Sequence, residues 1–340
     1  MRPLFHNFLK TLTSSCQISR GSNLVAAVSG GPDSIALLHL LAGVQQQLQL
    51  RLTAVWVDHG LRPEETPLKK WIVSDATKKL GIPFIPYQVD AASYAAEQRI
   101  SLEHAARDLR YTVLRETARQ EQAKYIAVAH TADDQAEEIL LRFLSGKGSR
   151  GKSGMRMCSQ DVIRPLLGTS KQDLLSWLAD QNIEYCIDSS NNNPKFLRKR
   201  VRHHLLPFLE EHFDAGIKKS LRKTADSLVE DEQLLAELTA EAEKDIVREV
   251  AGNGSGEPPK VRILRQPFCV LHASLRRRLV EQLLWRIGSG FKYDHILLIL
   301  EAAVTGKNNS ELHLSRGLRL GVFHEYLEFS YPFGQKTWSG

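Results

Sequence analysis

Hydrophobic residues in the first half of the chain fall into four short apolar runs. Between these runs, hydrophobic residues recur at helical spacing. Short apolar runs separated by helix-length segments are typical of parallel strands joined by helices. The pattern therefore predicts an α/β fold with a doubly wound parallel sheet that carries helices on both faces. The four runs are NLVAAVS at 23–29, LTAVWVD at 52–58, PFIPYQV at 83–89 and YIAVAH at 125–130.

The second half of the chain has a different pattern. A long polar helical pattern covers 217–250, and the segment AGNGSGEPPK at 251–260 interrupts it. Beyond it, 274–287 and 293–304 are predicted helices, and strand-like alternation surrounds LSRGLRL at 314–320. The expected parts are a large sheet-containing domain over 1–212, a helical linker over 213–252 and a small α/β domain over 253–340.

The charge balance suggests a class of partner. The chain has 45 Lys and Arg against 39 Asp and Glu, which gives a net charge of +6 and an isoelectric point near 9.1. Basic residues are concentrated at 195–204 and 217–223. Clustering of this kind favours a polyanionic partner such as a nucleic acid.

The cysteines and the apolar runs indicate a compartment. The cysteines stand singly, which argues against a zinc ribbon or a disulfide framework and fits a reducing environment. The N-terminal MRPLFHNFLKTLTSS lacks the apolar core of a signal peptide, and no later run reaches the roughly 20 apolar residues of a membrane span. We therefore expect a cytoplasmic protein with no membrane partner. The four cysteines are Cys16, Cys158, Cys186 and Cys269.

The first apolar run leads into SGGPDS at 29–34, a candidate phosphate loop. A strand, a Gly-Gly turn and a helix present backbone N–H groups and a helix N-terminus to an anion. A second string, GKGSRGKS at 146–153, matches a nucleoside-triphosphatase loop but lacks a strand before it and a helix after it. We therefore assign phosphate binding to the first loop and interpret the second as a basic loop that could touch RNA. The predicted nucleotide-binding residues are Ser29, Gly30, Gly31, Pro32, Asp33 and Ser34.

SGGPDS resembles the signature of the PP-loop ATP pyrophosphatases. Five further stretches, in order with this loop, resemble one branch of that superfamily, the tRNA(Ile)-lysidine synthetases. Together they cover most of the first 210 residues. They are VWVDHGLRPE at 55–64, EHAARDLRY at 103–111, VAHTADDQAEEILLRFLSGKG at 128–148, IRPLL at 163–167 and DSSNNNPKFLRKRVRHHLLPFL at 188–209.

The resemblance implies a fold, a reaction and its substrates. The fold would be Rossmann-like, of the adenine nucleotide alpha hydrolase type, and ATP would bind with Mg²⁺. The loop would grip the β and γ phosphates as a unit, so that the α-phosphate is attacked and pyrophosphate leaves. The C2 oxygen of cytidine 34 in tRNA(Ile) with a CAU anticodon would be adenylated, and the ε-amine of free L-lysine would then displace AMP. The product, lysidine, would change codon reading from AUG to AUA, and a homodimer is left open.

Two arginines and a histidine are candidates for contact with these substrates. Arg107 and Arg110 lie three apart on a predicted helix, so both can point to one side and meet phosphate or carboxylate oxygens. A solvated helix face is the alternative. His130 ends a predicted strand, where a doubly wound sheet collects its ligands, although a capping or core role is the alternative there.

Acidic residues follow on the next predicted helix. Asp134 and Glu138 lie four apart on one face, a like-charge pairing that costs stability unless a cation or an arginine compensates. Mg²⁺ or a substrate amine would do so. Asp133 is expected to cap this helix and Glu137 to face solvent. With the resemblance, the predicted catalytic residues are Asp33, Arg107, His130 and Asp134, with Asp33 also the predicted metal ligand.

The basic segment after NNNP is predicted to be a tRNA-binding helix. Its apolar residues would form a buried side, which directs the basic side chains away from the core, and no acidic residue between 195 and 209 neutralises them. A solvated face is the alternative. The apolar residues are Phe196, Leu197, Val201 and Leu205, and the predicted tRNA-binding residues are Arg198, Lys199 and Arg202.

The chain departs from the family pattern in two places, and three rival functions stay open. Arg198-Lys199 stands where the family usually has Arg-Asn, and AEE at 136–138 stands where it commonly has AET. Some members also carry a further C-terminal domain. One rival is a tRNA thiolase, which needs paired reactive cysteines, whereas the four here are isolated in sequence. The others are a nucleotide-sensing RNA module and a phosphoryl-transfer enzyme that uses the loop at 146–153.

Overall fold

The structure is a computed structural model that describes residues 2–61, 63–145, 154–187, 197–250, 260–287, 293–314 and 317–331. The chain divides into two compact units, Met1–Val229 and Glu230–Gly340, and each is described by itself. The alternative loop at 146–153, the asparagine-rich turn within 188–196 and the interruption at 251–259 lie outside the described residues. The division into three domains stays a prediction.

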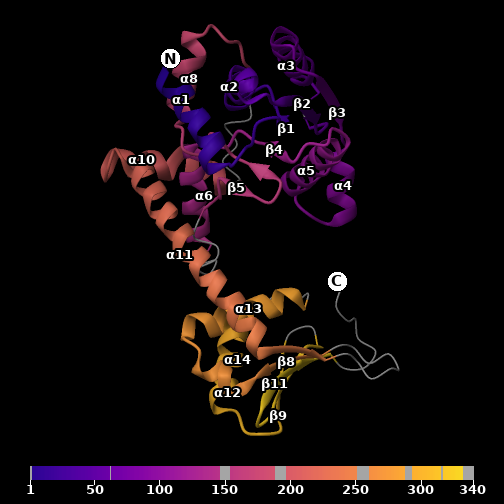
Figure 1. Cartoon of the computed structure of the whole chain (residues 1–340), viewed down its shortest axis with the longest axis vertical. Coiled ribbons are helices and arrows are strands. Elements are labelled where there is room, and N and C mark those ends of the chain that lie inside the picture. Colours follow the sequence, from indigo (N-terminus) through magenta and orange to yellow (C-terminus); the bar gives the residue numbers. More distant parts are fainter. Residues whose placement is uncertain are drawn as a thin grey trace. The chain divides into compact units, whose positions relative to one another are not determined.

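A six-stranded sheet forms the centre of the first unit, in the order β3-β2-β1-β4-β6-β5 (Figure 1). Neighbouring strands pair in parallel except for β5 and β6, which pair antiparallel. This arrangement confirms the predicted α/β class with a mostly parallel sheet. The strands are β1 Asn23–Ala27, β2 Arg51–Asp58, β3 Phe84–Gln88, β4 Tyr125–Ala127, β5 Cys158–Ser159 and β6 Val162–Ile163.

Helices cover both faces of this sheet because successive strand residues point to opposite sides. Leu24 and Ala26 of β1 pack in a core shared with α1, α2, α3 and α8, whereas Val25 packs in a second core with α5. Burial on both faces explains why the strands read as continuous apolar runs. The helices of this part are α1 Arg2–Lys10, α2 Pro32–Leu48, α3 Thr66–Leu80, α4 Ala91–Gln98, α5 Leu102–Gln120, α6 Ala132–Leu144 and α8 Lys171–Asp180.

The strand order reverses at β1, and this reversal positions the site. The chain passes from β1 through α2 to β2 on one side, and later returns to β4 on the other side of β1. Loops that leave the carboxyl ends of two such strands diverge and open a crevice. The loop after β1 carries the predicted phosphate loop, and the loop after β4 carries His130.

A helical segment follows in the later part of the first unit. The predicted basic helix is α9 continued by a π-helical turn, and the predicted long polar helix is α11, which begins in the first unit and ends in the second. The last four residues of the predicted helical range form strand β7 instead. The elements are α9 Leu197–Arg200, the π-helical turn Val201–Leu205, α10 Leu206–His212 and α11 Ile217–Ile246.

The second unit contains an antiparallel sheet in the order β7-β8-β11-β10-β9, as expected for a small C-terminal α/β domain. Its apolar core lies between the sheet and its helices. Within this unit Arg278 is only 2% exposed and binds both carboxylate oxygens of Glu232, at 2.5 and 2.6 Å. The elements are β7 Val247–Val250, β8 Lys260–Leu264, α12 Arg265–Val270, α13 Ala273–Arg286, α14 Tyr293–Thr305, β9 Ser310–His313, β10 Arg319–Val322 and β11 Tyr326–Ser330.

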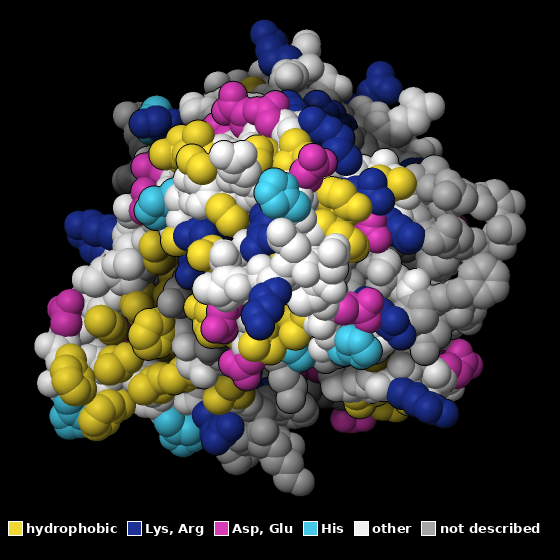
Figure 2. Space-filling model, turned by 90° about the horizontal axis from the view of Figure 1, so that it is seen from below, with side chains coloured by type: hydrophobic (Ala, Val, Ile, Leu, Met, Phe, Trp, Pro, Cys, Tyr) yellow, Lys and Arg dark blue, Asp and Glu magenta, His cyan; other side chains and the backbone are white. Residues whose placement is uncertain are grey.

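Exposed large hydrophobic side chains occur in both units, and Figure 2 shows hydrophobic side chains gathered on part of one face, interspersed with basic ones. Within the described residues, no helix is long and apolar enough to cross a membrane. A cytoplasmic location stays a prediction.

Two of the four cysteines are neighbours in the fold, although they stand far apart in sequence. Cys158 of β5 donates from Sγ to the carbonyl of Ser15, at 3.4 Å, directly beside Cys16. Burial raises the pKa of the Cys16 thiol, and the adjacent Cys158 raises it further. Cys16 and Cys158 are thus isolated in sequence but adjacent in the fold, because the 158–163 hairpin returns to the N-terminal helical segment. All four cysteines are free thiols.

Candidate active site

The predicted phosphate loop is a tight turn between β1 and α2. Gly31 is the extended N-cap residue of α2, and Pro32 occupies the first helical position, where its missing N–H breaks no hydrogen bond. Gly30 has φ of +88°, and a Cβ there would lie 3.4 Å from the Lys69 carbonyl oxygen. The positive φ would strain any other residue at this position, which explains the glycine.

Two serine hydroxyls brace this loop from within. The Ser29 amide donates to Ser34 Oγ at 3.1 Å, and the Ser34 hydroxyl donates to the Gly31 carbonyl at 2.9 Å. Ser34 is buried, whereas Ser29 also lines the neighbouring pocket. The hydroxyls thus fix the turn that points the first amides of α2 toward a ligand.

Asp33 lies in the first turn of α2, and its two carboxylate oxygens have different surroundings. Its Oδ2 lies 3.6 Å from Nζ of Lys171, the first residue of α8. Its Oδ1 is buried and makes no hydrogen bond within the described residues. Burial raises the pKa of Asp33, Lys171 lowers it and Asp134 raises it, for a net upward shift. A cation at Oδ1 would satisfy this oxygen and favour the ionised form.

A pocket of about 560 Å³ opens beside this loop, at the carboxyl ends of β1, β2 and β4. Its wall combines apolar strand residues, including the buried Trp56, with polar groups from five different segments. The polar lining includes the predicted residues Ser29, Gly31, Asp33, Ser34, His130, Asp134 and Arg202, together with Asp58, His59 and Arg110. The structure therefore brings three of the four predicted catalytic residues to one cavity.

His130 follows β4 and faces this pocket as a neutral imidazole. Its Nδ1 is buried without a hydrogen bond to any described residue. Burial lowers the pKa of His130 to about 4, with Asp134 acting in the opposite direction and the arginines Arg164, Arg110 and Arg198 acting with burial. Burial also lowers the pKa of His59, and Arg110 adds to that effect. With a pKa of about 4, the His130 imidazole is uncharged at neutral pH.

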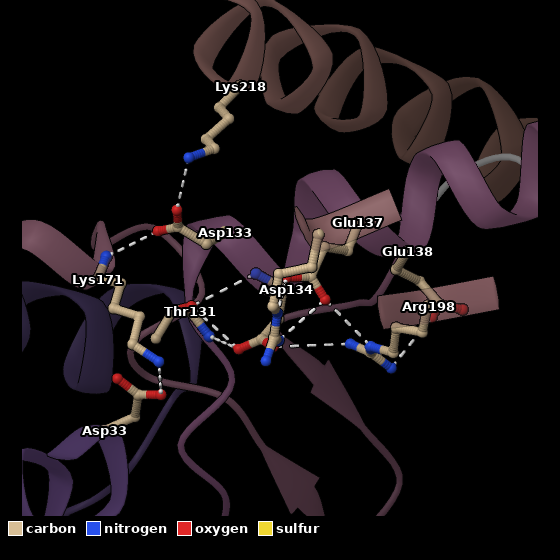
Figure 3. A network of polar contacts seen from close by, with 10 residues as sticks. Asp33, Thr131, Asp133, Asp134, Glu137, Glu138, Lys171, Arg198 and Lys218 are labelled. Carbon is tan, nitrogen blue, oxygen red and sulfur yellow. Dashed lines mark hydrogen bonds and ion pairs between the residues drawn. The ribbon is translucent and has the colours of Figure 1, made fainter. Parts of the chain in front are cut away.

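Thr131 begins helix α6, and Asp134 completes its capping box. Asp134 Oδ2 accepts from the Thr131 amide at 2.9 Å and from its hydroxyl at 3.0 Å. Asp133 was the expected cap, and that prediction is wrong. Asp133 instead accepts from the Lys171 amide at 2.7 Å and pairs with Lys218 at 3.1 Å (Figure 3).

Glu137 is the most buried acid of this region, contrary to the prediction that it faces solvent. Its side chain is 2% exposed, and it accepts from Nε of Arg202 at 2.5 Å and from Nε of Arg198 at 3.2 Å. Asp134 Oδ1 accepts from Arg202 at 3.0 Å. Figure 3 shows these carboxylates facing Arg198 from consecutive turns of α6. The arginines, and not only a ligand, compensate the acidic face.

The basic segment therefore points inward in part. Arg198 and Arg202 bind the acids of α6, so the expectation that these basic side chains point away from the core is wrong for both. Val201 is buried as predicted, whereas Leu197 is 42% exposed. The role of Arg198, Lys199 and Arg202 in tRNA binding stays a prediction. Burial lowers the pKa of Arg202, but its hydrogen bond and charge contact with Glu137 raise it overall.

Arg107 and Arg110 flank Tyr111 but line different cavities. Their guanidinium groups lie 5.1 and 5.3 Å from the centre of the Tyr111 ring. Arg110 lines the main pocket, whereas Arg107 lines a second hollow together with Arg115 and Arg164. The expectation that both arginines serve one side is therefore wrong, and the catalytic role of Arg107 stays a prediction.

The sequence profile of the PP-loop domain family matches residues 4–209. The fold is also similar to that of the U34-tRNA thiolase NcsA from Methanococcus maripaludis, solved with its [4Fe-4S] cluster. The TM-score is 0.54 at 16% identity, covering 67% of this chain and 81% of that one. The fold and the pocket thus define an ATP-binding protein of the PP-loop class.

Curated relatives give the family within that class. The tRNA(Ile)-lysidine synthase of Symbiobacterium thermophilum is 32% identical over 96% of this chain and 69% of its own length. The tRNA(Ile)-lysidine synthase of Bacillus subtilis is 31% identical over 92% of this chain and 66% of its own. The chain belongs to the tRNA(Ile)-lysidine synthase family, which consists of ATP-dependent ligases. It spans about two thirds of the length of these relatives.

Proposed function

We propose that this chain ligates free L-lysine to C2 of cytidine 34 in tRNA(Ile) with a CAU anticodon, and produces AMP and pyrophosphate. The observation that carries the proposal is the pocket of about 560 Å³, in which the phosphate loop, His130 and Asp134 meet in a chain of this family. With lysidine in its anticodon, the tRNA would read the codon AUA instead of AUG.

In this proposal the loop at 29–34 receives the triphosphate. The first amides of α2 point toward the β and γ phosphates, because a helix N-terminus stabilises negative charge. Asp33 fits a metal-bound nucleotide, because Mg²⁺ is commonly held by one or two carboxylates together with substrate phosphates. Bound there through Asp33, Mg²⁺ would neutralise phosphate charge. Within the described residues, no group of three or more acidic, histidine or cysteine side chains could hold a metal without a substrate.

The first chemical step is attack by the C2 oxygen of cytidine on the α-phosphorus. The bond to the bridging oxygen breaks, pyrophosphate leaves, and cytidine carries AMP on its oxygen. Arg110 suits the charge that develops on the α-phosphate, since it lines the pocket and its buried Nε makes no hydrogen bond within the described residues. An anticodon base is accessible to such a pocket because loop bases can leave their stack.

In the second step the lysine ε-ammonium gives a proton to solvent, its free nitrogen attacks C2, the bond between C2 and the adenylated oxygen breaks, AMP leaves, and the nitrogen releases a further proton to solvent. Asp134 is suited to attract the lysine ammonium, because it lines the pocket as a carboxylate. Burial would raise the pKa of Asp134, but the Thr131 amide and nearby cations lower it. A pKa of about 4 makes His130 a weak base, which favours a neutral hydrogen-bonding role in orienting the substrates.

Product analysis separates this function from its rivals. The protein is incubated with ATP labelled at the α-phosphate, L-lysine and a tRNA(Ile) transcript with C34, beside a matched transcript with U34. We expect the label to appear in AMP, and unlabelled pyrophosphate to be released, only with the C34 transcript. Release of ADP would indicate phosphoryl transfer, and ATP binding without turnover would indicate a nucleotide sensor. Either result would contradict the proposal.

A further inference from the structure

A second hollow of about 430 Å³ lies in the first unit, on a different set of residues from the main pocket. Its walls come from α4, from the outer side of α5 and from the β5–β6 hairpin. Three arginines line it, namely Arg107, Arg115 and Arg164, and Asp108 is the one acidic residue in its lining. The hollow therefore carries an excess of positive charge.

Most of this positive charge is not neutralised from within. Arg115 pairs with Asp161 at 2.9 Å, and Asp108 lies 3.4 Å from His104. Arg107 and Arg164 pair with no carboxylate of the described residues. Clustered arginines repel one another unless an anion lies between them, so the arrangement requires either solvent or a ligand of opposite charge.

Tyr111 and the protein backbone hold these arginines in place. The guanidinium groups of Arg107 and Arg115 lie 5.1 and 5.6 Å from the Tyr111 ring centre, within the range of cation–π attraction. Arg164 is only 9% exposed, and its Nη1 donates to the Arg156 carbonyl at 2.9 Å. Its Nε is buried and makes no hydrogen bond within the described residues. A buried donor of this kind costs stability unless an acceptor reaches it.

We infer that this hollow binds a phosphodiester of an RNA backbone, an inference that rests on the proposed use of tRNA as substrate. Arginine forks match the oxygens of a phosphate, and Arg164, buried and held by the Arg156 carbonyl, supplies a fixed donor in the lining of the hollow. Arg115 is 47% exposed at the rim, so a macromolecular ligand can reach it. The proposed function assigns the ATP phosphates to the loop at 29–34. The remaining source of phosphate among the proposed substrates is the backbone of the tRNA.

The test is tRNA binding by Arg115→Gln, measured across roughly 0.05–0.3 M salt, the range in which phosphate contacts dominate affinity. Loss of one contact should lower the slope of log affinity against log salt by about 0.7–0.9. Arg119→Gln is the matched control, because Arg119 is exposed one turn further along α5 and does not line the hollow. Its slope should change less than that of Arg115→Gln, and ATP affinity should stay unchanged in both variants.

Two further variants separate binding from a structural role. Asp161→Asn removes the ion pair of Arg115 but adds net positive charge, so tRNA should bind at least as tightly as to the parent. Weaker binding by Asp161→Asn, equal to that of Arg115→Gln, would assign Arg115 to the fold and overturn the inference. Arg115→Lys keeps the charge and should keep most of the salt slope, while losing the bidentate fork.

The outcomes also distinguish this inference from the proposed function. An unchanged salt slope in Arg115→Gln, in a protein that still modifies tRNA, would overturn the phosphodiester site alone. A raised KM for lysine with unchanged tRNA binding would overturn it too, and would assign the hollow to the lysine carboxylate. A lowered slope in a protein that forms no lysidine would support the RNA site and contradict the proposed reaction.

Discussion

Replacing Glu137 by Ala is expected to destabilise the first unit, because it removes the shared partner of two arginines. Glu137 is 2% exposed and accepts three hydrogen bonds from Arg198 and Arg202. In Glu137→Ala, Asp134 and Glu138 remain as partners, and neither lies as close to the Nε atoms of the arginines. The two guanidinium groups would then lose the carboxylate closest to their Nε atoms, and an apolar methyl group would take its place.

The size of the effect follows from the burial of the partners. Breaking a fully buried ion pair costs about 3–5 kcal/mol. Arg198 and Arg202 are 32% and 37% exposed, so water screens part of the lost attraction. We therefore expect a loss of roughly 2–3 kcal/mol. For a unit of this size each kcal/mol lowers Tm by about 2–4 °C, so Tm should fall by roughly 4–12 °C.

Thermal unfolding of three variants gives the measurement. Glu137→Gln keeps an acceptor oxygen without the charge, and its Tm should lie between those of the parent and Glu137→Ala. Glu211→Ala is the control, because Glu211 is 76% exposed and its removal should change stability by less than about 0.5 kcal/mol. In a double-mutant cycle, Arg202→Ala should cost less in Glu137→Ala than in the parent. Independent effects of the two substitutions, or a parent-like Tm for Glu137→Ala, would refute the network.

Two other substitutions test the pocket. Asp33→Asn should lower turnover by roughly 10²–10³-fold while tRNA affinity and Tm are preserved, because the buried Oδ1 supports phosphate charge and not the fold; equal losses of turnover and Tm would indicate misfolding. His130 has a folded pKa of about 4, below its ordinary value of 6.5, so its contribution to stability is present above pH 6.5 and is lost as the pH falls toward 4. As the pH falls through that window, the free energy of unfolding should therefore decrease less in His130→Asn than in the parent. The difference between the two proteins should grow by at most about 1.4 kcal/mol per pH unit. Equal pH profiles would contradict the buried neutral imidazole.

The sheet and the position of the site could be predicted because they depend on local pattern. The runs of β1, β2 and β4 are buried on both faces, so each reads as a strand without knowledge of its neighbours, whereas the run of the edge strand β3 is only partly buried. The predicted phosphate loop and His130 follow strands that turned out to lie on either side of the point where strand order reverses. The start of α6 at Thr131 could also have been predicted from sequence, since Thr131 and Asp134 have the spacing of a capping box.

The burial of Glu137 could not be predicted because its cause is distant in sequence. Its partners lie 61 and 65 residues further along the chain, on the helical segment that packs against α6. From sequence alone, the basic segment had no neutralising acid nearby, whereas the fold supplies acids from another helix. The separation of Arg107 from Arg110 also depends on distant segments, because Arg110 lines the main pocket with the loops after β1 and β4, whereas Arg107 lines the second hollow with the β5–β6 hairpin.

Mass spectrometry of the tRNA tests the central proposal most directly. A tRNA(Ile) transcript with a CAU anticodon is incubated with the protein, ATP and L-lysine, digested to nucleosides and compared with a reaction that lacks lysine. The account predicts that one cytidine gains the mass of one lysine less one water, and only when ATP and lysine are both present. A cytidine of unchanged mass, or a nucleoside that gains sulfur instead, would contradict it.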